Sequence, residues 1–219
     1  MRIVRTMLLG AQLLWVVSAV AADPPFPVVS DGKWGFGDRS GKVVIPYQFE
    51  EAVYFREGLG RVKQDGKWGF VDEKGTLKIP ARFDDAGDFY QGLARVVQHE
   101  GVAGRKCGYV DKEGKLVIGY EYTNAGNFSH ELARVEHDGK WGYVDKTGKL
   151  AIKPQFDESA DFSDGLARVK AGGDWAGKYG YIDNTGTFKV NPRYKGNRPA
   201  EHRSERPAGA TGESFVVAV

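Results

Sequence analysis

The stretch Gly66-Lys67-Trp68-Gly69-Phe70-Val71-Asp72 decides the fold, because copies of it recur at regular intervals along the chain. Residues 32–36 and 139–143 keep its Gly-Lys-Trp-Gly-aromatic start, and residues 105–109 and 177–181 are more diverged copies. The key residues of the five copies lie 34, 39, 34 and 38 residues apart, and they are Trp34, Trp68, Cys107, Trp141 and Tyr179. A period of this size predicts an array of tandem structural repeats.

Other residue types keep the same register. A glycine follows each key residue directly: Gly35, Gly69, Gly108, Gly142 and Gly180. An aspartate falls four residues after each key residue: Asp38, Asp72, Asp111, Asp145 and Asp183. An arginine falls twenty-seven residues after the first four: Arg61, Arg95, Arg134 and Arg168. Agreement at this many positions identifies five copies of one unit.

The second copy shows how one unit begins. Alternation of side chains places Trp68 and Phe70 on one face of a strand, so the key residues are expected to face the core. Gly69 leaves room on the other face for a neighbouring backbone. Residues 72–75 then predict a turn, because an aspartate side chain can cap the turn amides and the final glycine accepts a positive φ.

The rest of the unit is predicted to form three more strands. Residues 77–79 return alongside the first strand, and Pro80 is expected to end the ladder because it has no N–H to donate. Two aromatic residues six apart follow, Phe83 and Phe89, and residues 93–96 form a last short strand. Four short strands in about 34 residues cannot bury their own aromatic side chains, so stacked neighbours must cover them.

The repeated unit resembles the bacterial WG (Trp-Gly) β-repeat family over residues 31–194. The shared motif is Lys-Trp-Gly-(Phe/Tyr)-Val-Asp-x-x-Gly, then Ile-Pro-x-x-Phe, then Phe-x-x-Gly-Leu-Ala-Arg-Val. Cys107 and Tyr179 depart from the key tryptophan, and Gly119 stands where other copies have proline. The resemblance implies an exported or surface repeat protein, and it brings no general set of catalytic residues.

The beginning of the chain reads as an export signal. Two arginines precede an apolar run that ends in Ala19-Val20-Ala21, a pattern that signal peptidase accepts. The run is too short for a membrane span, so we expect no stable membrane insertion after cleavage and a periplasmic or extracellular location. We therefore expect a signal peptide at 1–21, a repeat domain at 22–194, a flexible segment at 195–212 and a candidate closing strand at 213–219. The copies lie near residues 32–65, 66–104, 105–138, 139–176 and 177–194.

The sequence predicts an all-β, curved or closed (propeller-like) array of five repeats, with an open β-solenoid as the alternative. Residues 28–34 align with residues 62–68, so the mature chain begins with the last strand of a unit. That strand would complete the fifth copy and seal a ring. Alternatively, residues 213–219 would return to complete the fifth copy and leave the array open.

Charge and composition exclude several classes of partner. Without the two arginines of the signal segment, 29 basic residues balance 29 acidic ones, so there is no electrostatic footprint for nucleic acid. The single cysteine rules out a disulfide framework within one chain. The sequence predicts no cofactor and no metal site.

The regular arginines are the first candidate binding residues. Arg61, Arg95, Arg134 and Arg168 offer charge at regular spacing for an anionic polymer. The favoured alternative is that each arginine pairs with an acid of an adjacent repeat, for example Asp84 or Asp157. His99 and His137 occupy the same junction of different copies, which suggests a shared rim site, against the more frequent case of two solvated histidines. Each repeated aspartate is expected to cap a turn.

Two insertions give the second set of candidates. The junctions at 97–104 and 170–177 are longer than their counterparts by five and four residues, and both fall at the same place in the unit. Trp175 lies outside the repeat register beside Asp174, and it suits stacking on a sugar or anchoring a partner. The alternative is that Trp175 folds down to cap the edge of the fifth copy.

These observations favour an exported, non-catalytic scaffold that binds an unidentified protein or peptide. A binder of carbohydrate or envelope polysaccharide is the second hypothesis, and an envelope hydrolase is the third.

Overall fold

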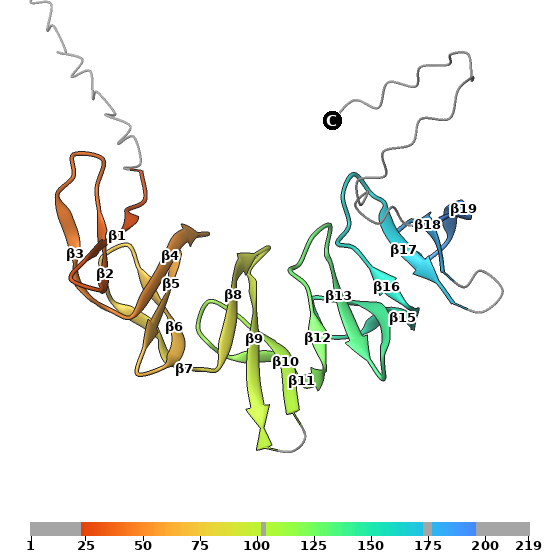
Figure 1. Cartoon of the computed structure of the whole chain (residues 1–219), viewed down its shortest axis with the longest axis horizontal. Helices are drawn as coiled ribbons and strands as arrows, with labels where there is room; N and C mark the ends of the chain where they lie inside the picture. Colours follow the sequence, from red (N-terminus) through yellow and green to blue (C-terminus); the bar gives the residue numbers. More distant parts are fainter. Residues whose placement is uncertain (1–22, 102–103, 173–176, 196–219) are drawn as a thin grey trace, which may run out of the picture.

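The computed structural model describes residues 23–101, 104–172 and 177–195 (Figure 1). Within these residues the chain forms 19 β-strands in five antiparallel sheets, which stand side by side in an arc. The all-β, curved array of tandem repeats predicted from the sequence is therefore confirmed. No helix in these ranges is long and apolar enough to cross a membrane.

Each sheet consists of strands that are consecutive in the chain. The first sheet has three strands: β1 (Phe26–Ser30), β2 (Lys33–Gly37) and β3 (Val43–Phe49). The second sheet has four: β4 (Glu51–Arg56), β5 (Leu59–Gln64), β6 (Lys67–Asp72) and β7 (Leu77–Phe83). The third also has four: β8 (Asp85–Tyr90), β9 (Leu93–Glu100), β10 (Gly104–Val110) and β11 (Leu116–Tyr122).

The last two sheets have the same four-stranded plan. The fourth contains β12 (Asn124–Ala125), β13 (Leu132–His137), β14 (Lys140–Asp145) and β15 (Leu150–Phe156). The fifth contains β16 (Glu158–Ser159), β17 (Ala167–Ala171), β18 (Lys178–Ile182) and β19 (Phe188–Lys195). The first strand of each four-stranded sheet lies toward the concave side of the arc, and the last strand lies toward the convex side (Figure 1).

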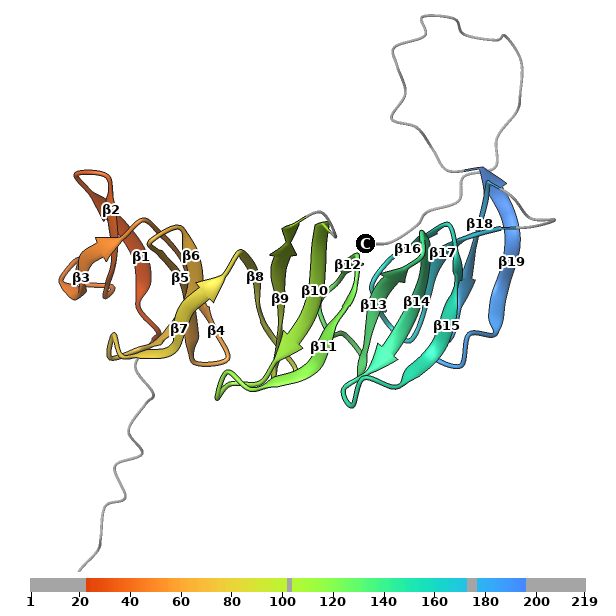
Figure 2. The ribbon, with the colours of Figure 1, turned by 90° about the horizontal axis from the view of Figure 1, so that it is seen from below.

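The sheets are offset from the sequence repeats, and this corrects the prediction that the strand at residues 28–34 completes the fifth copy. β1 pairs with β2 in the first sheet and not with the fifth copy. The fifth sheet is already four-stranded, because its first two strands come from the fourth copy. Residues 213–219, the candidate closing strand, lie outside the described residues together with 1–22 and 196–212, so this part of the prediction stays a prediction. The first and fifth sheets stand at opposite ends of the row of sheets (Figure 2), which is curved into an arc when seen in Figure 1.

The repeated aspartates cap turns, as predicted. The Asp72 carboxylate accepts hydrogen bonds from the N–H groups of Lys74 and Thr76 at 3.0 and 2.9 Å, and the other four turns repeat this pattern. At Asp145 a hydrogen bond from the Thr147 hydroxyl lowers the pKa of the carboxyl group. These aspartates are structural.

The repeated glycines accommodate an irregular ladder. In the second sheet Phe70 pairs with Ile79 while Trp68 pairs with Phe83, so two additional residues bulge from β7. A Cβ on Gly69 would lie 2.6 Å from the Ile79 oxygen and 2.7 Å from the Ala81 nitrogen. The predicted close approach of a backbone is confirmed. The prediction that Pro80 ends the strand is wrong, because a proline at a bulge leaves no ladder bond unmade.

Apolar cores lie between consecutive sheets. Four clusters of buried side chains each combine residues of two neighbouring sheets. At the centre of each cluster, an aromatic ring on the strand that carries the key residue of one sheet contacts a phenylalanine that precedes the arginine-bearing strand of the next sheet. These pairs have ring centroids 4.9–5.0 Å apart: Phe36–Phe55, Phe70–Phe89, Tyr109–Phe128 and Tyr143–Phe162. Stacked neighbours therefore cover the aromatic side chains, as expected.

The deepest position is two residues beyond the key tryptophan. Phe36, Phe70, Tyr109 and Tyr143 are all fully buried. Of the key residues, Cys107 is fully buried and Trp68 is nearly so, whereas Trp34, Trp141 and Tyr179 are half-buried. The key residues border the core, and the aromatic residue after the glycine fills its centre.

Candidate functional site

The repeated arginines latch consecutive sheets together. Arg134 on β13 donates hydrogen bonds to the Asp161 carboxylate at 2.9 Å and to the Ser159 carbonyl at 2.7 Å, both in the fifth sheet. Its guanidinium also lies 5.0 Å from the centre of the Trp141 ring. Cation–π stacking and charge-assisted hydrogen bonds thus act on the same side chain.

The second sheet repeats this latch and the third modifies it. Arg61 stacks 4.7 Å from the Trp68 ring, donates to the Ala86 carbonyl and lies 3.4 Å from the Asp88 carboxylate. Arg95 has no aromatic key residue beside it, because Cys107 occupies that position. It donates instead to Asp85 of its own sheet at 3.1 Å.

The acids expected to pair with these arginines have other partners. Asp84 accepts hydrogen bonds from the Lys67 ammonium and from the His99 N–H, and the lysine contributes most to lowering the pKa of Asp84. Asp157 accepts from Lys140 at 2.5 Å. The arginine side chains reach past Asp84 and Asp157 to carboxylates four residues later in the chain, which the sequence register did not indicate.

A matched pair of substitutions tests the latch. Arg134→Ala should lower the free energy of unfolding by about 1–2 kcal/mol, because two hydrogen bonds between sheets and one ring contact are lost. Arg168→Ala, at the same repeat position of the fifth sheet, should cost less than about 0.5 kcal/mol. Urea denaturation of both variants measures the difference, and equal losses would contradict a latch role.

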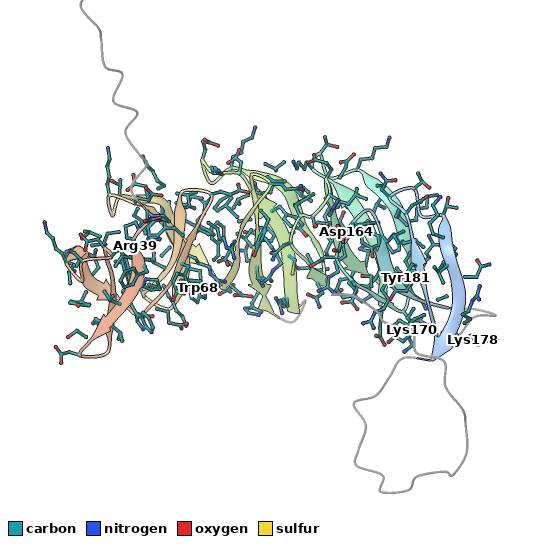
Figure 3. The ribbon with its side chains drawn as sticks, turned by 90° about the horizontal axis from the view of Figure 1, so that it is seen from above. Arg39, Trp68, Asp164, Lys170, Lys178 and Tyr181 are labelled. Atoms are coloured by element: carbon teal, nitrogen blue, oxygen red, sulfur yellow. The ribbon has the colours of Figure 1, made fainter. Side chains whose placement is uncertain are left out.

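Among the residues that the structure describes, no further sheet packs on the outward face of the fifth sheet. We call the surface formed by Leu166, Arg168, Tyr179, Tyr181 and Val190 the terminal face. Tyr181 is 39% exposed, whereas its four counterparts Phe36, Phe70, Tyr109 and Tyr143 are fully buried. Leu166 is 36% exposed, whereas Leu59, Leu93 and Leu132 at the same repeat position are at most 8% exposed. Figure 3 shows Tyr181 in the fifth sheet and Trp68 within the second. An apolar surface built for burial is thus open among the described residues.

Arg168 gives the terminal face its charge. It is exposed, and its guanidinium lies 4.8 Å from the centre of the Tyr179 ring, the geometry of the other latches. Among the described residues, no carboxylate or carbonyl accepts a hydrogen bond from Arg168. The terminal face therefore presents an apolar centre beside a latch arginine.

Polar residues at the edge of the terminal face are tied into one network. Glu158 accepts hydrogen bonds from Lys170 at 2.8 Å and from the Tyr179 hydroxyl at 2.5 Å. Lys170 contributes most to lowering the pKa of Glu158, and the same network raises the pKa of the Tyr179 hydroxyl. Glu158 is therefore ionised at neutral pH, and Tyr179 keeps its proton.

The structure places the two candidate histidines on separate sheets with separate partners. His99 on β9 lies 3.6 Å from the Asp84 carboxylate, and His137 on β13 packs edge-on against Tyr122. Both are more than half exposed. Among the described residues no group of three or more His, Cys, Asp or Glu side chains could hold a metal ion.

The insertions fall where the sequence placed them, in hairpins that join the second and third strands of a sheet. One connects β9 to β10, and the other connects β17 to β18. Asp174 and Trp175 lie outside the described residues, so their predicted binding role stays a prediction. Their hairpin nevertheless begins and ends on strands of the terminal face.

Sequence reasoning missed Leu166 and Tyr181. Both occupy regular core positions, and nothing in their identity distinguishes them from buried counterparts. The signal was positional, because no sheet follows the fifth one among the described residues.

Known proteins can now be compared with this geometry. The WG containing repeat family model matches residues 34–68, 68–100, 108–141 and 141–175. Similar solved structures include a eukaryotic initiation factor (13% identity, TM-score 0.51, covering 79% of this chain and 54% of that one). Hsv2p of Kluyveromyces lactis is also similar (11% identity, TM-score 0.46, covering 74% of this chain and 58% of that one).

These likenesses have a limited reach. The chain spans about half the length of the solved structures it matches, and at this identity the likeness shows the fold alone. No curated protein matches the sequence. The four family matches cover more than half of the chain. The tryptophan and glycine repeated in them border and shape the cores between sheets. The chain therefore belongs to the WG containing repeat family.

Proposed function

We propose that this protein is an exported, non-catalytic repeat scaffold that binds a protein or peptide through the terminal face. The observation that carries the proposal is the exposure of Tyr181 and Leu166. The counterparts of Tyr181 are buried at all four junctions, and the leucines corresponding to Leu166 are buried at the three junctions that have them. Exposed apolar surface rimmed by polar groups is typical of protein interaction sites.

The fourth junction indicates what chemistry the partner would supply. There Tyr143 packs against Phe162, and Arg134 binds the Asp161 carboxylate and the Ser159 carbonyl. The terminal face offers the corresponding Tyr181 and Arg168. A partner segment that carries an aromatic residue next to an acidic one would make the same contacts.

Export is part of the proposal and is supported by the sequence. Residues 1–21 combine the basic start, apolar run and small-residue end of a signal peptide. Terminal sequencing of the protein recovered from outside the cytoplasm should give a mature chain that starts near residue 22 or 23. Recovery of the intact N-terminus in the cytoplasm would contradict export.

Quantitative pull-down from envelope extract tests the binding role. Wild-type protein should capture a partner that Tyr181→Asp and Arg168→Ala variants capture at least about tenfold less well, since each removes one group that the partner contacts. Arg39→Ala is the matched control, because Arg39 is an exposed arginine that forms an ion pair with Asp23, away from the terminal face. Equal capture by all four proteins would reject the terminal face as the binding site.

Carbohydrate binding is the second candidate, and one observation favours it. Tyr181 and Tyr179 are aromatic, the first is exposed, and Lys170 and Glu158 supply polar groups beside them. Such a combination suits stacking on a sugar ring. Titration with soluble cell-wall fragments, monitored by intrinsic fluorescence, distinguishes carbohydrate binding from protein binding. A saturable change abolished by Tyr181→Ala would favour the sugar, and no change together with partner capture would eliminate it.

A further inference from the structure

Within the part of the chain that the structure describes, the first sheet lacks the strand that begins every other sheet. In the second sheet, β4 pairs with β5 through Lys63, Val62 and Gly60. The corresponding residues of β1 are Val29, Val28 and Phe26, and no described strand pairs with that edge. An unpaired edge of this kind is a template for another strand.

An apolar hollow lies beside this free edge. It has a volume of about 680 Å³, and its lining includes Pro27, Val29, Trp34 and Tyr54. Val29 is 54% exposed and Tyr54 is 64% exposed. The hollow lies between the first and second sheets, at the place where a first strand of the first sheet would run.

The first junction also lacks the arginine latch. Pro27 occupies the repeat position of Arg61, and Tyr54 occupies the position of Asp88 and Asp161. Both partners of the latch are thus replaced together. No arginine side chain fills the space beside Pro27, and this space is part of the hollow.

We propose that residues 213–219 of the same chain pair with β1 as the missing strand of the first sheet and fill this hollow. The first strands of the complete sheets begin with an acidic or amide residue followed by alanine or serine. Glu213-Ser214 repeats Glu158-Ser159, which begins the fifth sheet. Antiparallel pairing in that register sets Glu213 opposite Val29 and Ser214 opposite Val28. This inference does not depend on the binding role of the terminal face.

The next residue of the segment complements the hollow. Phe215 falls at the repeat position of Gly126, where a Cβ would lie 2.7 Å from Cγ of the latch residue Arg134. A large side chain is therefore excluded at Gly126, beside the Arg134 latch. At the first junction Pro27 replaces the arginine, so an aromatic ring at this position has room and apolar neighbours.

At a third position, the large and the small side chain of a cross-strand pair would change places between the two strands. In the second sheet Phe55 lies opposite Gly60, where a Cβ would come within 3.0 Å of the Phe55 ring. In the first sheet the position of Gly60 is held by Phe26, and the position of Phe55 would be held by the smaller Val217. The pairing of a large residue with a smaller one is therefore kept. The large residue lies on the first strand in the second sheet and would lie on β1 in the first sheet.

The chain between the fifth sheet and the segment is long enough. Residues 196–212 connect Lys195 to Glu213, and a fully extended connection of this length spans about 60 Å. Packed sheets lie about 10 Å apart, so four junctions separate the first and fifth sheets by about 40 Å along the arc. The segment can therefore reach β1 of its own chain.

A disulfide trap tests the register and the source of the strand. In protein lacking the predicted signal peptide, Val28→Cys with Ser214→Cys should form an intramolecular bridge, because directly opposite residues have suitable Cα separation. Val28→Cys with Ala218→Cys is the matched control and should oxidise at least about tenfold more slowly. The native Cys107 is buried and gives little background.

Two outcomes would overturn the proposal. Equal oxidation of the two pairs would show that the segment has no fixed register, and a disulfide-linked dimer would show that a second copy supplies the strand.

Hydrogen exchange provides a second measurement without cysteines. Amides of residues 213–219 and of Phe26–Ser30 should exchange at least about tenfold faster in Phe215→Asp than in wild type. Val216→Asp is the control and should leave exchange unchanged, because that repeat position holds Asp88 and Asp161 in other sheets. Rapid exchange of residues 213–219 already in wild type would contradict the pairing.

Discussion

Phe70→Ala should lower the free energy of unfolding by about 3–5 kcal/mol, the range for truncating a fully buried phenylalanine. Tyr181→Ala, at the same repeat position of the fifth sheet, should cost less than about 1 kcal/mol. The ring of Phe70 is fully buried and lies 4.9 Å from the ring of Phe89 across the second junction. Tyr181 has no following sheet among the described residues.

The comparison separates burial from sequence identity. Both side chains are aromatic, and both stand two residues after a key position, so a loss that followed the motif alone would be equal for the two variants. Denaturant unfolding monitored by far-UV circular dichroism measures both losses. A Tyr181→Ala loss as large as that of Phe70→Ala would show that the terminal face is covered in solution.

Gly69→Ala should lower the free energy of unfolding by about 1–3 kcal/mol, the usual cost of overpacking. The added methyl group would meet backbone atoms of the β7 bulge at 2.6–2.8 Å. Backbone atoms of a hydrogen-bonded strand cannot move aside as a flexible side chain can. The methyl group therefore forces the bulge away from β6 or breaks its pairing.

Gly119→Ala is the matched control for Gly69→Ala. A Cβ there meets only the end of the Glu121 side chain, at 3.3 Å, and Gly119 does not have a positive φ. The change should therefore leave stability within about 0.5 kcal/mol or raise it slightly, because alanine restricts the unfolded chain. Thermal unfolding of both variants decides, and similar melting temperatures would contradict the close approach at Gly69.

Much of the fold follows from repetition. Equal spacing of Trp68 and its counterparts predicts the array, and the interval from Asp72 to Gly75 predicts the turn. These are local features in which each residue acts within a few neighbours. They could be predicted because every copy repeats the same local requirement.

Features that depend on the meeting of two sheets could not be predicted in this way. The partner of Arg134 is Asp161 and not Asp157, because the sheet boundary and its bulges set which acid lies within reach. The prediction that Pro80 ends the strand was wrong for a related reason. Pro80 lies in the bulge of β7, where no ladder hydrogen bond requires an N–H group. Tyr181 is exposed because no described sheet packs against it, and no residue of the fifth copy indicates this.

The separate cores between sheets have a consequence for how such a protein can change in length. Each cluster is completed by two neighbouring sheets, so the molecule has no common centre to which all sheets contribute. Duplicating or deleting one internal module would leave every remaining boundary with its proper counterpart. Gene-level gain or loss of a module therefore changes the span of the protein without requiring its interior to be redesigned.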